Sequence, residues 1–114
     1  MTEEEQFQAL IVALILEGRV EEALKRLAAY YRVEMPRIRV GVVKRHFRDA
    51  AAVYLPRRRT IVARTREAFL NPFTVLHEWY HHLRSSGGEH RGTERYADRF
   101  AQQFLAAYRK ALEA

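Results

Sequence analysis

Histidines and carboxylates gather in one quarter of the chain, between residues 73 and 98. This stretch holds four of the five histidines, and residues 77–81 (HEWYH) match the pattern His-Glu-x-x-His. Two histidines four positions apart on a helix differ by about 40° around its axis, so both imidazoles can reach one zinc ion. Glu78 lies about 100° round from His77, where a base would act on a water at the metal. The pattern therefore predicts a metal site with His77 and His81 as ligands.

A third ligand must come from another element. The spacing that would supply a third histidine fails, because Arg84 and Gly87 occupy the positions of its glycine and histidine. Glu94 is better placed, at the start of the last expected helix, and Asp98 follows one turn later on the same face. The glycines between the two helices allow the sharp return that this arrangement requires. Two histidines and one glutamate leave the fourth zinc position open to water, as in catalytic zinc sites.

Other polar residues of this stretch have competing interpretations. His82 falls one turn after Glu78 and could line the cleft and donate to an oxyanion, although a surface histidine is the simpler interpretation. Tyr96 offers similar chemistry, but an aromatic residue on an apolar stripe usually belongs to the core. Glu89 and His90 are alternative ligands, although their glycine-rich surroundings are more typical of an exposed loop.

The elements that must position these residues follow from capping and periodicity. Thr2 before three glutamates starts a helix that contains the apolar run 7–16, and Gly18 separates it from a second helix at 20–31. Alternation from Ile38 to Val42 predicts a strand, and further strands are expected at 51–55 and 60–63 around a turn. Asn71-Pro72 starts the metal helix, and Thr93 caps the last helix. We expect an α+β fold with two N-terminal helices, a small mixed sheet of about three strands, the metal helix and a glutamate helix.

The composition fits one small domain, 1–114, without thiolate ligands. The sequence has no cysteine, so imidazole and carboxylate remain as metal ligands, and a reducing compartment is favoured. The longest apolar run, 9–16, is too short to cross a bilayer, and the acidic start is unlike a secretory signal, so we expect a cytoplasmic protein with no membrane partner. The net charge of +6 comes mainly from residues 32–66. It leaves nucleic acid open as a partner, although a solvated arginine-rich surface is the simpler explanation.

The motif resembles that of a known family. His77-Glu78-x-x-His81, followed by Glu94-x-x-Ala97-Asp98, is similar to the gluzincin zinc metallopeptidases. At this length the chain looks most like the single-domain minigluzincins, and its core also resembles HtpX-type peptidases and ImmA/IrrE proteins. The likeness is most specific over 71–104 and extends loosely back to residue 38.

The resemblance implies a minimal zincin fold and one zinc ion held by His77, His81 and Glu94. It also implies that Glu78 is the general base and acid, and that Asp98 accepts the ring N–H of His77. The likeness further implies that the strand Ala51-Ala52-Val53-Tyr54 binds an extended peptide or protein substrate by adding a strand. An exposed edge strand also invites self-association.

Two departures from the larger gluzincins leave alternatives open. The gap between His81 and Glu94 is short, and we expect no counterpart of the subdomain that often carries a transition-state-stabilising histidine or tyrosine. The expected activity is a zinc-dependent metalloendopeptidase. The alternatives are a latent or catalytically silent zinc-binding member of the family and a basic nucleic-acid-binding or regulatory module.

Overall fold

The computed structural model describes residues 1–41, 50–85 and 93–114. Its elements in chain order are α1 (Glu3–Leu16), α2 (Val20–Tyr31), β1 (Arg37–Val40), β2 (Ala52–Leu55), the 3-10 turn η2 (Pro56–Arg58), β3 (Thr60–Ala63), the 3-10 turn η3 (Arg66–Leu70), α3 (Pro72–Ser85) and α4 (Glu94–Glu113). The expected α+β fold is confirmed. Several residues considered above lie outside the described ranges, namely Val42, Gly87, Glu89 and His90.

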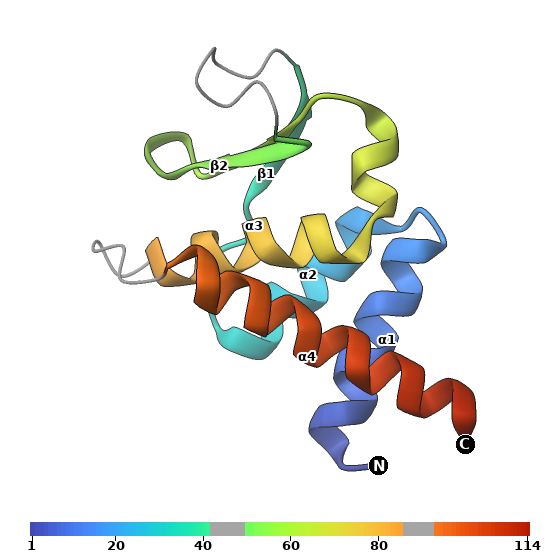
Figure 1. Cartoon of the computed structure of the whole chain (residues 1–114). Helices are drawn as coiled ribbons and strands as arrows, with labels where there is room; N and C mark the ends of the chain where they lie inside the picture. Colours follow the sequence, from blue (N-terminus) through green and yellow to red (C-terminus); the bar gives the residue numbers. More distant parts are fainter. Residues whose placement is uncertain (42–49, 86–92) are drawn as a thin grey trace.

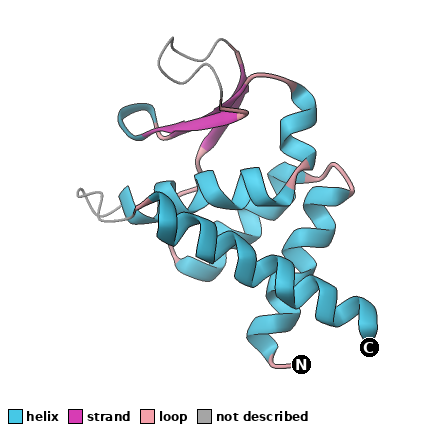
Figure 2. Ribbon diagram, in the orientation of Figure 1, coloured by secondary structure: helices cyan, strands magenta, loops and turns pink. Residues whose placement is uncertain are grey.

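The sheet is mixed and has the order β1-β3-β2. β1 pairs in parallel with β3, and β2 pairs with β3 in the antiparallel direction. Within the described part of the chain, β3 is the only strand that pairs with β2, so β2 forms an edge. Figures 1 and 2 show this small sheet on one side of α3, with α4 and α1 on the other side.

The N-terminal helix α1 is fixed at its start and packs against α4. The Thr2 hydroxyl accepts the Glu5 N–H at 3.0 Å, and the Glu5 carboxylate accepts the Thr2 N–H at 2.9 Å, which forms a capping box. The Lys110 ammonium of α4 donates to the same Glu5 carboxylate at 2.9 Å. Ile11 and Ile15 of α1 and Phe104 of α4 are fully buried in the core. Burial of this apolar area stabilises the helical layer that carries the site.

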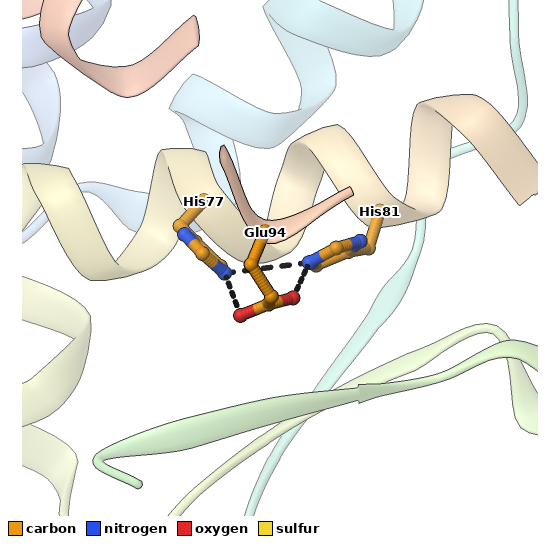
Figure 3. Close-up of side chains that lie close together, drawn as sticks. All are labelled: His77, His81 and Glu94. Carbon is orange, nitrogen blue, oxygen red and sulfur yellow. Dashed lines mark hydrogen bonds and ion pairs between the residues drawn. The ribbon is translucent and has the colours of Figure 1, made fainter. Parts of the chain in front are cut away.

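The metal helix α3 lies between β2 and α4. Asn71 caps its first turn, since its side-chain oxygen accepts the Phe73 N–H at 3.0 Å. Val75, Leu76 and Trp79 are completely or almost completely buried and hold one face of α3 in the core. The opposite face carries His77 and His81, and it is directed toward β2 and the first turn of α4 (Figure 3).

None of the helices within residues 1–41, 50–85 and 93–114 combines the length and apolar character that crossing a bilayer requires.

Candidate metal centre

Three side chains from two helices converge on one point, as Figure 3 shows. His77 Nε2 and His81 Nε2 of α3 are 3.3 Å apart. The Glu94 carboxylate of α4 spans both rings, with one oxygen 3.0 Å from His77 Nε2 and the other 2.6 Å from His81 Nε2. The prediction that these residues form a group able to hold a metal ion is confirmed.

Local structure explains this convergence. His77 and His81 are separated by one helical turn, so their rings project from the same face of α3. Glu94 opens α4 directly after Thr93, whose hydroxyl accepts the Tyr96 N–H at 3.2 Å and so fixes the first turn of α4. The side chain of Glu94 is 78% exposed, whereas that of His77 is 12% exposed. The site is therefore walled by the imidazoles and open on the side of the carboxylate.

Asp98 determines which nitrogen of His77 is available. Its carboxylate lies 2.9 Å from His77 Nδ1, and a carboxylate can only accept from a neutral imidazole. His77 therefore carries its proton on Nδ1 in the neutral form and directs the Nε2 lone pair at Glu94 and His81. Three groups that offer lone pairs face one another at hydrogen-bond distance, and this arrangement is stable only with a proton or a cation between them.

The distances suit a small tetrahedral cation. Two ligands of a tetrahedral ion at about 2.0–2.1 Å stand roughly 3.3 Å apart, and the two Nε2 atoms are separated by that distance. Two imidazoles and one carboxylate fit zinc and several other divalent metals, so the donor set defines the kind of site without selecting one metal.

Glu78 lies next to the convergence point and is shielded from water. It is 9% exposed, and its carboxylate comes within 3.9 Å of His77 Nε2. The pKa of Glu78 is raised from 4.5 to about 7, mainly by burial. The His77 ring and the Tyr54 backbone N–H lower this pKa, whereas the Glu94 charge raises it. A carboxyl group with a pKa near neutrality can both take up and release a proton, as general acid–base chemistry requires.

A groove of about 470 Å³ runs between β2 and the metal residues. Residues 50–54 form one wall, and His77, Glu78, His81 and Glu94 form the other. The Arg64 N–H donates to the Ala51 carbonyl at 3.0 Å, so Ala51 faces β3. Alternation along an antiparallel strand then directs the backbone groups of Ala52 and Tyr54 outward, toward the groove. The Tyr54 N–H donates to Glu78, whereas the backbone groups of Ala52 face the groove.

Phe73 and Thr74 also line the groove, and the sequence analysis did not identify them. They precede His77 by four and three positions, so they share its face of α3. The Phe73 ring centroid lies 6.1 Å from that of His77. The helical spacing that selected His81 could have found both residues.

His82 does not line the metal groove, and the expectation of a surface histidine is also wrong. It is 1% exposed. Its Nε2 is 2.6 Å from the Glu34 carbonyl, and its Nδ1 is 2.7 Å from the Tyr54 hydroxyl. Since a carbonyl only accepts, Nε2 carries the proton and Nδ1 accepts from Tyr54. Burial lowers the pKa of His82, which favours this neutral form. His82 therefore joins β2 to α3 and has both nitrogens occupied.

Tyr96 was expected to lie in the core or in the cleft, and both placements are wrong. It is 52% exposed, does not line the groove, and stacks under Arg99, whose guanidinium carbon lies 5.7 Å from the ring centroid. The buried stripe of α4 consists instead of Ala97, Ala101, Phe104 and Ala107. One position of difference on a helix rotates a side chain by about 100°, which places Tyr96 outside the stripe that begins at Ala97.

Comparison of the chain with known protein families, with curated proteins and with solved structures finds no match. The geometry of the site and the resemblance of its motif are therefore the features that indicate a function.

Proposed function

We propose that this protein is a zinc-dependent metallopeptidase of the gluzincin type, with the cytoplasm as its place of action. One observation carries the proposal: Nε2 of His77, Nε2 of His81 and the Glu94 carboxylate converge, while Asp98 holds the His77 proton on the far side of its ring. Glu78 and an edge strand then flank this point, as hydrolysis of an extended peptide requires.

Zinc held by these three residues would act as a Lewis acid on the scissile carbonyl and lower the pKa of water toward about 7. The other steps belong to the chain itself. Backbone groups of Ala52 on the outer edge of β2 would bind the substrate main chain and orient it along the groove. Glu78 would accept a proton from the attacking water and transfer it to the leaving amine as the C–N bond breaks.

Replacing Glu78 by Gln tests the proposed base without removing a ligand. We expect Glu78→Gln to bind one zinc ion per chain, as the wild type does, and to lose peptide cleavage by a factor of about 10² or more. The measurements are metal content after dialysis and cleavage of a broad peptide library. His81→Ala is the matched variant for the metal, and it should lose both zinc and activity. Full cleavage by Glu78→Gln would refute the mechanism.

The second candidate function is zinc binding without cleavage, and the lining of the groove supports it. Besides the two histidine ligands, the lining has two side chains with an O–H or N–H donor, Tyr54 and Thr74. The Tyr54 hydroxyl already donates to His82. Thr74 is thus the side-chain donor left for an oxyanion among the described lining residues. A zinc-loaded protein that cleaves no member of the peptide library would establish this candidate, whereas cleavage would exclude it.

A further inference from the structure

A second surface feature lies at the other edge of the sheet. Arg37 and Arg39 of β1 and Arg57 and Arg58 of η2 line one hollow of about 610 Å³. We call these four residues the arginine surface. All four are exposed. The hollow shares no lining residue with the metal groove, and β3 separates β1 from β2.

Among the described residues, the four arginines have no acidic partner, unlike several other arginines. Arg19 and Arg26 form ion pairs with Glu22, and Arg59 pairs with Glu34. Within residues 1–41, 50–85 and 93–114, no carboxylate forms an ion pair with any member of the arginine surface. Glu34 and Arg59 line the same hollow and pair with each other, so the four remaining guanidinium groups give the hollow a net positive charge that a bound anion would offset.

The distribution of charge along the sequence also favours binding of an anion in this part of the chain. Residues 32–66 contain eleven basic and two acidic residues, a net charge of +9, whereas the rest of the chain carries −3. Eight of these basic residues and one of these acidic residues lie in the described ranges 32–41 and 50–66, so the sheet and the segments next to it are strongly positive, whereas the helices are slightly acidic. Solubility alone requires only that positive and negative residues are interspersed over the surface. It does not explain why the two signs are segregated in one small domain.

The arrangement fits a regular polyanion. Arg37 and Arg39 alternate with Ile38, so they share one face of β1, about 6.6 Å apart along the strand. The Arg37 N–H donates to the Arg59 carbonyl at 2.8 Å, which joins β1 directly to the η2 segment. Guanidinium groups bind phosphate oxygens through two parallel hydrogen bonds, and a nucleic acid strand presents a phosphate at every nucleotide.

We propose that the arginine surface binds the phosphodiester backbone of nucleic acid, independently of the metal groove. No aromatic side chain lines the described hollow, so base stacking contributes nothing there and sequence preference is absent. A nucleic acid strand at the arginine surface and a peptide in the metal groove could be bound at the same time, since the two sites share no lining residue.

The test is a salt titration of binding to labelled single-stranded DNA, RNA and duplex DNA, measured by fluorescence anisotropy with a chelator present. Four phosphate contacts predict a slope of log K against log[salt] of about −2.8 for single strands and about −3.6 for duplex. The variant Arg37→Gln/Arg39→Gln/Arg57→Gln/Arg58→Gln should lose affinity at least tenfold and nearly all of this slope.

A matched variant separates a defined surface from net charge alone. Lys25→Gln/Arg26→Gln/Arg84→Gln/Arg109→Gln removes the same charge from exposed positions on the helices. This control should bind nucleic acid almost as tightly as the wild type, and both variants should keep the wild-type zinc content and circular dichroism spectrum.

Three outcomes would overturn the proposal: no binding of nucleic acid at about 50 mM salt, equal losses in the two variants, or equally tight binding of polyglutamate, which would show an acidic protein as the partner. The chelator removes metal from the binding assay, so this test does not depend on the proposed peptidase activity. Either proposal could be refuted while the other is supported.

Discussion

At the residue scale, His77 is restrained from both sides of its ring. Asp98 holds Nδ1 at 2.9 Å, while Nε2 faces Glu94 and His81. A histidine fixed in this way needs no reorientation before it binds a metal ion, so less conformational entropy is lost on binding. We therefore expect Asp98 to influence metal affinity, although it does not belong to the group formed by His77, His81 and Glu94.

Removal of Asp98 should weaken metal binding. We expect Asp98→Ala to raise the dissociation constant for zinc about 10- to 100-fold, because the His77 ring loses the group that sets its tautomer and orientation. Competition with a chromogenic chelator measures this constant. Gln102→Ala, one turn further along the exposed side of α4, serves as the control and should leave it unchanged. Equal affinities of the Asp98 variant and the wild type would show that the contact has no role in binding.

Glu78 should make the metal-free protein less stable as pH rises. Burial raises its pKa from 4.5 to about 7, so between these values the folded state binds more protons than the unfolded state. The free energy of unfolding then falls as pH increases through this window and levels off above it. At pH 8 the loss amounts to about 3 kcal/mol.

Glu78→Gln removes this titration and provides the measurement. In urea unfolding with a chelator present, the variant should be more stable than the wild type at pH 8, and the difference should shrink toward pH 4.5. A difference between variant and wild type that stays constant from pH 4.5 to 8 would contradict the raised pKa.

At the scale of elements, a buried hydrogen-bonded chain joins β2 to α3. The Tyr54 hydroxyl donates to His82 Nδ1 at 2.7 Å, and His82 Nε2–H donates to the Glu34 carbonyl at 2.6 Å. Tyr54 also donates its backbone N–H to Glu78. His82, the residue after His81, thus holds the strand that walls the groove, and each of its ring nitrogens makes one hydrogen bond.

Removal of the Tyr54 hydroxyl tests this connection. Tyr54→Phe leaves His82 Nδ1 buried without a donor, and we expect a loss of about 1–3 kcal/mol in the free energy of unfolding. Tyr80→Phe is the control, since no described contact involves its hydroxyl, and it should change stability by less than about 0.5 kcal/mol. Denaturant unfolding of the two variants measures both values. A Tyr54 variant as stable as the wild type would mean that water replaces the lost donor.

The same elements show what sequence patterns can predict. The pair His77 and His81 depends on spacing along one helix, and the caps at Asn71 and Thr93 are local, so both helix starts were predictable. His82 depends on partners 28 and 48 positions away, and neither contact leaves a signal in the local pattern. Glu94 is intermediate, because its helix was predictable whereas its approach to α3 depends on how the two helices pack.

At the scale of the whole molecule, metal binding should be coupled to folding. The ligands come from α3 and α4, which meet only in the folded chain, so an ion that binds them stabilises the native state. At a free zinc concentration 100 times the dissociation constant, the gain is about 2.7 kcal/mol. This corresponds to a rise of roughly 10 °C in the melting temperature of a domain of this size.

Thermal unfolding with and without zinc measures this coupling. His81→Ala should show a rise of less than about 2 °C under the same conditions, because two ligands bind zinc weakly. At the zinc concentration used for the wild type, the melting temperature of Asp98→Ala should rise by an amount between those of the wild type and His81→Ala. A wild-type melting temperature that does not change with zinc would show that His77, His81 and Glu94 do not bind zinc in the folded protein.

Both chain ends lie together at the end of the molecule opposite the sheet, as Figure 1 shows. The ion pair between Glu5 and Lys110 fixes this arrangement, since it joins the first turn of α1 to the last turn of α4. A tether, dye or fused module attached at Met1 or Ala114 would therefore point away from β2. The protein can be coupled to a bead or sensor chip by either end with its groove facing the solution, so immobilised copies should accept ligands as readily as free ones.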